Sequence, residues 1–157
     1  MNSIHWHTKA FDELTVNELY DIMRLRTDVF VVEQNCPYPE LDGKDKKCLH
    51  IFATKLDQIV ACARIVPPGL SYPEIAIGRV AVHADYRKDG YGRVLMQHAI
   101  DKIAEEFGEQ DIQIGAQGYL KKFYGSFGFE PSSEEYVEDG IPHVDMIRKA
   151  KHYWTKL

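Results

Sequence analysis

The chain has 157 residues, a formal net charge of −5, 45% hydrophobic residues and 27% charged residues. This balance is typical of a soluble globular protein, no stretch is long and apolar enough to span a membrane, and the acidic charge disfavours a nucleic-acid scaffold, which would show a basic face. We therefore expect one domain over residues 1–157, with neither a membrane nor a nucleic acid as partner.

The N-terminal residues MNSIHWHTKAFDEL lack the basic and apolar pattern of a secretory signal, so a cytoplasmic protein is expected. The cysteines Cys36, Cys48 and Cys62 lack the spacing of a zinc site or a CxxC motif, which favours reduced structural thiols over nucleophiles. The histidines show no ligand spacing joined to a carboxylate set. No metal site is predicted.

The first part of the chain predicts a strand, a helix and a long loop. Alternation over Ile4 to Thr8 indicates the strand. Thr15-Val16-Asn17-Glu18 fits a capping box, and the apolar spacing after it predicts a helix to about Phe30. The proline- and glycine-containing segment from there to Lys47 indicates a surface loop of the length that often serves binding.

The middle of the chain predicts three strands in series, then a helix and another strand. His50 to Leu56 and Ile59 to Val66 should form a hairpin, and Glu74 to Val82 should pair antiparallel with the second of these strands. Apolar residues at helical spacing predict a helix over Tyr91 to Phe107. Asp111 to Ala116 is then the parallel neighbour of a right-handed crossover, which makes the fold mixed α/β.

The last part of the chain predicts a short helix over Leu120 to Phe127, closed by Gly128, and a hairpin-like segment from Tyr136 to Ile147. No internal repeat or linker interrupts the sequence.

One stretch, GRVAVHADYRKDGYG from Gly78 to Gly92, favours an anion site. A strand that gives way to a glycine turn and a helix presents unpaired N–H groups and the positive end of the helix dipole. The glycines alone are a weak signal, and they fit neither a P-loop nor a dinucleotide fingerprint.

Longer strings resemble a known family. VAVHADYRKDGYGRVLM and GAQGYLKKFYGSFGF are similar to the two core motifs of the GNAT superfamily of acetyl-CoA-dependent N-acetyltransferases, and RTDVFVVEQNCPYPELDGKD and EDGIPHVDM resemble its ElaA-like branch. The resemblance covers nearly the full length. It implies an acyl-CoA N-acyltransferase fold, a central mixed sheet splayed between the fourth and fifth strands with helices on both faces.

The resemblance also implies a site for acetyl-CoA. Val80, Ala81 and Val82 would pair with the pantetheine arm, and an N–H near Val80 would polarise the thioester carbonyl. The pyrophosphate would be held, mostly by backbone N–H groups, in the loop of Arg87, Lys88, Asp89, Gly90, Tyr91 and Gly92. The Asp89 carboxylate should then point to solvent. Lys88 or Arg93 is a candidate to neutralise CoA, the alternative being an ordinary solvated cation.

Tyr124 occupies the position where the family commonly places its general acid. A departing CoA thiolate must be protonated or stabilised, and a phenol suits that role. The alternative is an aromatic side chain that only packs among its neighbours.

Two residues are candidates for the base that deprotonates the amine, Glu33 at the end of the first helix and His143 in Gly140-Ile141-Pro142-His143. Both also have a purely structural interpretation, a helix end for one and a strand hydrogen bond for the other. Glu33 and His143 are further expected to contact the substrate, together with Gln34, His50 and Arg79.

The resulting prediction is an enzyme that uses acetyl-CoA as cosubstrate and transfers acetyl to a primary amine by direct attack, without an acetyl-enzyme. The alternatives are a non-catalytic CoA-binding sensor of the same fold and a structural protein that binds no nucleotide. The acceptor, a small-molecule or peptide amine, stays open, although acidic loops are compatible with a cation. A homodimer also stays open.

Overall fold

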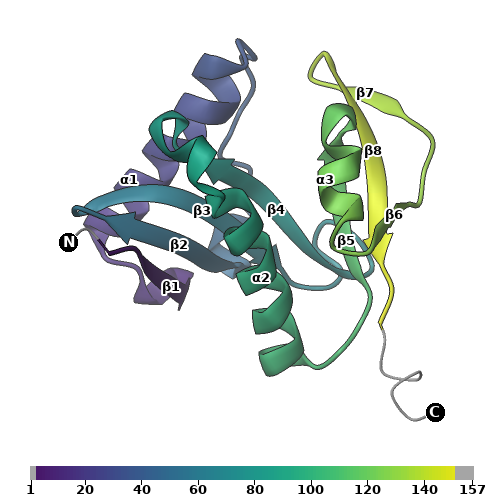
Figure 1. The fold of residues 1–157 in the computed structure, drawn as a ribbon, viewed down its shortest axis with the longest axis horizontal. Helices are drawn as coiled ribbons and strands as arrows, with labels where there is room; N and C mark the ends of the chain where they lie inside the picture. Colours follow the sequence, from purple (N-terminus) through teal and green to yellow (C-terminus); the bar gives the residue numbers. More distant parts are fainter. Residues whose placement is uncertain (1–2, 151–157) are drawn as a thin grey trace.

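The computed structural model describes residues 3–150, and they form one mixed sheet of eight strands (Figure 1). The order along the sheet is β1-β2-β3-β4-β5-β8-β6, with β7 paired to β8. Every pairing is antiparallel except that of β4 with β5. The strands are β1 His5–Ala10, β2 Leu49–Lys55, β3 Gln58–Val66, β4 Ile75–Val82, β5 Ile112–Gln117, β6 Phe129–Pro131, β7 Tyr136–Glu138 and β8 Ile141–Arg148.

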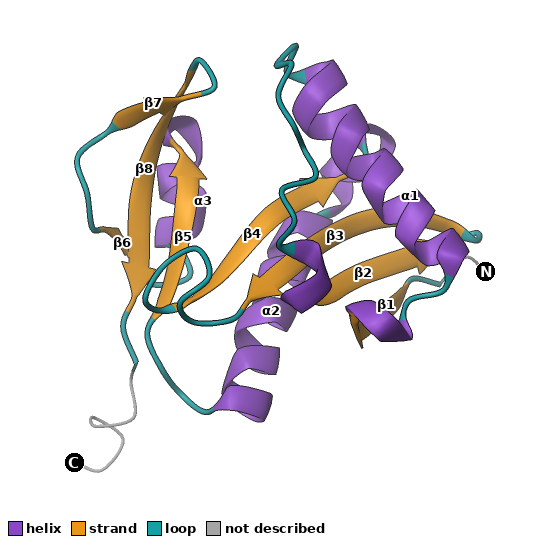
Figure 2. Ribbon diagram, turned by 180° about the vertical axis from the view of Figure 1, so that it is seen from behind, coloured by secondary structure: helices purple, strands orange, loops and turns teal. Residues whose placement is uncertain are grey.

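Helices cover both faces of the sheet, as Figures 1 and 2 show from opposite sides. The helix α1, Val16–Thr27, lies on one face, and α2, Tyr91–Phe107, and α3, Lys121–Gly125, lie on the other. Short 3₁₀ turns occupy Phe11–Glu13, Asp45–Lys47, Ala84–Asp89 and Gly118–Leu120. Within the described residues, no helix is long and apolar enough to cross a membrane.

Alternation along the strands builds a separate apolar cluster on each face. In β2, Phe52 packs with Ile22 and Leu25 of α1, whereas its neighbour Ile51 packs on the opposite face with Leu95 of α2. Successive strand residues point to opposite faces, so a strand buried on both sides is apolar throughout. The hydrophobic effect therefore fixes both helix layers to the same three central strands.

The capping box at the start of α1 is confirmed. The Thr15 hydroxyl accepts from the Glu18 N–H at 3.0 Å, and the Glu18 carboxylate accepts from the Thr15 N–H at 2.9 Å. The helix does not continue regularly to Phe30, because a π-helical turn, Asp28–Glu33, follows Thr27. Such turns widen the helix by one residue per turn and shift every later side chain around the axis.

The predicted hairpins are confirmed, with local differences. Leu56 and Asp57 both have positive φ, which is the geometry of a two-residue hairpin turn matched to strand twist. The β7–β8 hairpin turns at Asp139 and Gly140. The strand β6 was not predicted, since three residues carry no periodic pattern, and the expected helix over Leu120 to Phe127 is shorter than its apolar pattern indicates.

Candidate active site

A cleft opens in the sheet where β4 and β5 separate. The two strands pair only at Ile75–Ile112 and Ala76–Gln113, and then diverge, which confirms the predicted splay. The edge of β4 beyond Ala76 therefore has no partner among the described strands on that side. A cavity of about 820 Å³ lies between the diverging strands. Residues of β3, β4, β5, β8 and the segment after α1 line it. A volume of this size suits a drug-sized ligand.

A bulge in β4 turns its backbone into this cleft. The register passes from Cys62–Ala81 to Arg64–Gly78, so three steps along β4 oppose two along β3. Arg79 has a φ of 51°, which is uncommon for a side chain with a β-carbon. Residues held in such conformations concentrate at functional sites. Val80, Ala81 and Val82 follow the bulge, and all three line the cavity.

The loop after β4 places the N-terminus of α2 at the cleft. Gly90 adopts a left-handed φ of 76°, and α2 begins at Tyr91 without a side-chain cap or an acidic residue in its first turn. The free N–H groups of such a helix start, with the positive dipole end, form an anion site. Gly92 lines the cavity beside Val82 and Phe123. Lys88 and Asp89 are exposed and do not line the cavity.

Arg87 and Glu33 form an ion pair that joins this loop to the π-helical turn after α1. Both terminal nitrogens of Arg87 donate to the Glu33 carboxylate, one of them at 2.6 Å, and its Nε donates to the Val82 carbonyl at 3.1 Å. These hydrogen bonds lower the pKa of Glu33 despite partial burial. A carboxylate held in this way is a poor proton acceptor, which argues against Glu33 as the general base. The contacts of Arg87 with Glu33 and the Val82 carbonyl instead fix the conformation of the loop.

The side chains of Tyr91 and Arg93, in the first turn of α2, contact neighbouring residues. The Arg93 guanidinium lies 4.8 Å from the Phe127 ring centre and donates to the Ser126 hydroxyl at 2.7 Å. The Tyr91 hydroxyl accepts a hydrogen bond from the Lys55 ammonium at 3.2 Å. The described contacts of Arg93 therefore hold α2 against α3.

Tyr124 lines the cavity in an aromatic setting. It is 8% exposed and packs edge-on against Phe123, with ring centres 5.1 Å apart. Burial raises its pKa to about 12, so its phenol stays protonated. Its hydroxyl has no hydrogen-bond partner among the described residues, although the side chain lines the cavity. The phenol is thus a free donor.

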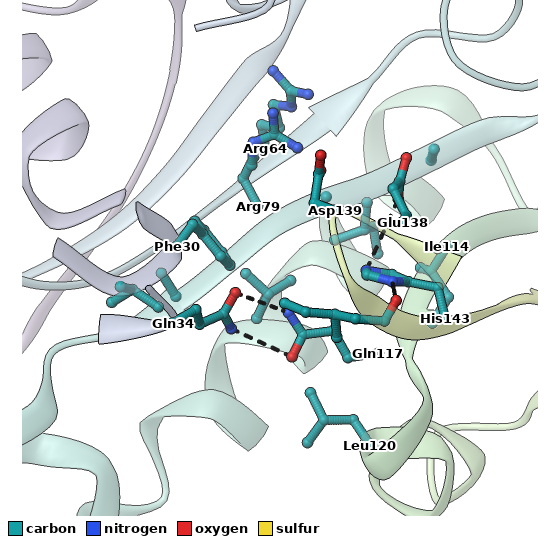
Figure 3. Close-up of a pocket in the computed structure, with 18 of the residues that line it drawn as sticks. Phe30, Gln34, Arg64, Arg79, Ile114, Gln117, Leu120, Glu138, Asp139 and His143 are labelled. Carbon is teal, nitrogen blue, oxygen red and sulfur yellow. Dashed lines mark hydrogen bonds and ion pairs between the residues drawn. The ribbon is translucent and has the colours of Figure 1, made fainter. Parts of the chain in front are cut away.

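His143 faces the cavity in a defined tautomer. Its Nδ1 lies 2.7 Å from the Ile141 carbonyl, which can only accept, so Nδ1 carries the hydrogen (Figure 3). In the neutral ring, Nε2 then has a free lone pair, and it lies 3.9 Å from a Glu138 carboxylate oxygen. The ring stacks on Tyr136 with centres 5.9 Å apart. This arrangement leaves Nε2 free to accept a hydrogen from a group in the cavity.

Gln34 pairs with Gln117, a cavity residue that the sequence did not indicate. Each side-chain amide donates to the other's carbonyl oxygen, at 3.4 and 3.2 Å (Figure 3). The π-helical turn ends at Glu33 and sends Gln34 toward the end of β5. The contact joins the two halves of the sheet across the open end of the splay. No local signal could have found Gln117, because its partner is 83 residues away.

A buried charge network orders the loop after α1. Arg26 donates to Glu40 at 2.6 Å and to Asp45 at 2.7 Å, while Arg64 donates to Asp42 at 2.6 Å. Arg79 adds a bond to Glu40 at 2.8 Å. Buried charges are stable only when paired and hydrogen-bonded, and this network meets that condition.

His50 belongs to that network and not to the cavity. It is 1% exposed, and its Nε2 lies 2.8 Å from the Asp45 carbonyl. The prediction that His50 contacts the substrate is therefore wrong, since the loop covers it. Arg79 does line the cavity.

The cysteines are free thiols within the described residues. Burial raises the pKa of Cys48 to about 11 and that of Cys62 to about 12. Cys36 lines the cavity, where its thiol donates to the Asp139 carbonyl at 3.2 Å. Across residues 3–150, no group of three His, Cys, Asp or Glu side chains could hold a metal ion.

The splayed sheet, the β4 bulge and the uncapped helix start define the class of acyl-CoA-binding acyltransferase folds. The family described as "Acetyltransferase (GNAT) domain" matches residues 21–150, and the chain belongs to this family. It is 41% identical to the protein ElaA of Escherichia coli, over 93% of this chain and 97% of that one. It is 45% identical to a UPF0039 protein of Schizosaccharomyces pombe over the same shares.

Solved structures agree with this assignment. The crystal structure of E. coli ElaA is similar with a TM-score of 0.88 and 40% identity, covering 94% of this chain and 100% of that chain. An acyl-CoA N-acyltransferase from Pseudomonas aeruginosa is similar with a TM-score of 0.89 and 38% identity, covering 93% and 99%. The family and these structures support acyl transfer as the general activity.

Proposed function

We propose that this protein is an acetyl-CoA-dependent N-acetyltransferase that moves acetyl to a primary amine by direct attack. One observation carries the proposal: the uncapped start of α2, the unpaired edge of β4, Tyr124 and His143 all border a single cleft. These elements correspond in order to the parts of acetyl-CoA. The α2 start suits the pyrophosphate anion, the β4 edge suits the extended amide arm, and the two side chains suit the thioester.

The binding half of the proposal uses backbone groups. The pyrophosphate would lie at the N-terminus of α2, where N–H groups and the helix dipole favour negative charge. The pantetheine amides would then add to the β4 edge as an extra strand would. An N–H near Val80, freed from β3 by the bulge, would point at the thioester carbonyl.

In the proposed reaction, His143 and Tyr124 have separate roles. The Nε2 of His143 would take a proton from the ammonium, and the nitrogen would then bond to the acyl carbon as the carbon–sulfur bond breaks. Since the pKa of Tyr124 is raised to about 12, well above the ~8.5 of an ordinary thiol, giving its proton to the thiolate would be unfavourable. Tyr124 would instead stabilise the thiolate by a hydrogen bond, and the nitrogen would supply the proton.

Direct attack is favoured over an acetyl-enzyme because no cysteine is set up as a nucleophile among the described residues. Cys48 and Cys62 are buried with raised pKa values and are therefore protonated, and the Cys36 thiol, which lines the cavity, donates its hydrogen to the Asp139 carbonyl. Reduced thiols also suit the cytoplasm, where we place the reaction.

The test measures CoA thiol release from acetyl-CoA with a panel of amines. Tyr124→Phe should lower kcat by about 10²–10³-fold, the loss typical of one transition-state hydrogen-bond donor, and leave the Kd of acetyl-CoA nearly unchanged. Tyr119→Phe is the matched control, since Tyr119 lines the same cavity but is 75% exposed. Full turnover in Tyr124→Phe would remove the tyrosine from the mechanism. Tight acetyl-CoA binding without turnover on any amine would favour the sensor.

A further inference from the structure

Among the described charged side chains that line the cavity, three are not paired with a side chain of opposite fixed charge. Glu33 is paired with Arg87, Asp42 with Arg64, and Arg79 with Glu40 behind the wall. The cavity-lining charges left over are Lys44, Glu138 and Asp139. Within the described chain, no carboxylate pairs with Lys44, whose ammonium donates to the Ser71 hydroxyl at 2.9 Å.

Arg64 has one N–H without a partner among the described residues, but this nitrogen is buried and not exposed to the cavity. Arg64 is 4% exposed, and its terminal nitrogens donate to Asp42 and Asp45, but its Nε–H meets no acceptor in residues 3–150. Gly78 stands next to it, because a β-carbon there would lie 3.9 Å from that Nε. The missing side chain of Gly78 leaves Arg64 as part of the cavity wall (Figure 3).

Asp42 joins the backbone at Lys44 to Arg64. One of its oxygens accepts from the Lys44 backbone N–H at 3.1 Å and from Arg64 Nη1 at 2.9 Å. The cation that the β3 side of the cavity leaves without an anion is therefore the Lys44 ammonium, among the described residues. Groups of this kind bind carboxylates well, because charge-assisted hydrogen bonds are the strong ones.

The other half of the sheet presents the opposite charge. Glu138 and Asp139 lie at the β7–β8 turn, with the His143 Nε2 3.9 Å from Glu138 (Figure 3). The Glu138 side chain is 59% exposed, and within the described residues its ionic contact is this histidine. An ammonium group would be drawn to this side, next to the proposed proton acceptor.

We propose that the acceptor is an amino acid, whose carboxylate is held by Lys44 while its amine lies beside His143 and Glu138. A polyamine fits the two acids but would bring a second cation toward Lys44. A simple monoamine would leave Lys44 without an anion. The zwitterion offers each side of the cavity the opposite charge.

This inference rests on the proposed function, and its reaction follows the same steps. The ammonium of the amino acid gives one proton to His143 Nε2, and its nitrogen bonds to the acetyl carbon while the carbon–sulfur bond breaks. The thiolate leaves with a second proton from that nitrogen. The products are an N-acetylamino acid, CoA and one proton that His143 returns to solvent.

The test compares each free amino acid with its carboxamide, which keeps the amine and the side chain but removes the negative charge, and with di- and polyamines. CoA thiol release is measured with acetyl-CoA. The preferred amino acid should exceed its carboxamide by at least about tenfold in kcat/KM, the effect of one charge-assisted hydrogen bond.

A variant makes the comparison specific to the carboxylate. Lys44→Met should raise the KM for the amino acid about tenfold and leave the KM for the carboxamide unchanged. Lys46→Met is the matched control, since Lys46 lies in the same segment, is exposed and does not line the cavity. Circular dichroism verifies folding of both variants.

The outcomes separate the two proposals. Equal or better turnover with carboxamides or polyamines, or a Lys44→Met effect common to acid and amide, overturns the amino-acid assignment while acyl transfer stands. Absence of turnover with every amine overturns the proposed function and this inference with it.

Discussion

Gln34 and Gln117 join the two halves of the splayed sheet by a reciprocal pair of amide hydrogen bonds at 3.4 and 3.2 Å. Gln34 follows the π-helical turn after α1, and Gln117 ends β5. The halves share only two paired positions between β4 and β5, so contacts at the open end matter for the shape of the cleft. The Cys36 thiol adds a second contact, to the Asp139 carbonyl.

The amide pair predicts a measurable coupling. Gln117→Leu and Gln34→Leu should each lower the free energy of unfolding by about 1–2 kcal/mol, because each removes both hydrogen bonds and leaves a partly buried amide unpaired. The double variant should cost little more than either single variant. Urea denaturation of all four proteins measures this coupling, and additive losses would show that the pair contributes nothing jointly.

Gly92 gives a prediction in which stability and binding change in opposite directions. Gly92→Ala should stabilise the protein by up to about 1 kcal/mol, because alanine is the better helix former and its β-carbon would meet Val82 and Phe123 at ordinary distances of 3.7 and 3.9 Å. The same methyl group would keep a ligand from the helix start and weaken acetyl-CoA binding by about tenfold or more.

Titration calorimetry and thermal melting measure the two effects of Gly92→Ala. Gly125→Ala in α3 is the control for helix propensity, since a β-carbon there meets nothing within 4 Å. Unchanged acetyl-CoA affinity in Gly92→Ala would remove this turn from the binding site. Gly90 is less informative, because its φ of 76° would strain any side chain whether or not a ligand binds there.

The choice between Glu33 and His143 as base leads to a kinetic prediction. His143→Gln should lower kcat by about 10²–10⁴-fold, the usual contribution of a general base. Glu33→Gln should keep most of the wild-type kcat, because Arg87 already lowers the pKa of Glu33 and holds its carboxylate.

The measurement is kcat at saturating acetyl-CoA for the three proteins. A large loss of kcat in Glu33→Gln, together with nearly full turnover in His143→Gln, would reverse the assignment. Glu33→Gln should instead weaken acetyl-CoA binding, because Arg87 loses the partner that fixes the loop.

A feature could be predicted from the sequence when the residues that interact are close along the chain. The capping box of Thr15 and Glu18 and the helix Tyr91–Phe107 depend on neighbours within four residues, so a linear pattern contains them. The splay was expected from the family resemblance and not from periodicity. Of the site residues, Tyr124 and His143 reach the cavity from their expected elements, while their roles stay predictions.

The rest depends on contacts between distant segments. Arg26 reads as a polar residue on a helix face, yet it is 1% exposed because Glu40 and Asp45 compensate its charge. His50 was placed near the cleft for its strand position, and only the covering loop shows that it is buried. Pairings across tens of residues leave no local pattern.

The buried network around Asp45 predicts how stability depends on acid. Burial opposes its ionisation, but hydrogen bonds and charge from Arg26 and Arg64 outweigh burial and lower the pKa of Asp45 below its ordinary value. The stabilisation is therefore present above the unfolded-state pKa of about 3.9 and is lost as pH falls through the lower folded-state value.

Asp45→Asn should lower the free energy of unfolding at neutral pH by about 3–5 kcal/mol, because it leaves two buried guanidinium groups with one anion fewer. It should also flatten the fall in stability below pH ~4, since the variant has no carboxyl to protonate there. Asp12→Asn is the control, because Asp12 is exposed on a surface turn. Urea denaturation from pH 7 downward measures both effects, and a parallel acid dependence of wild type and Asp45→Asn would assign the acid sensitivity to other carboxylates.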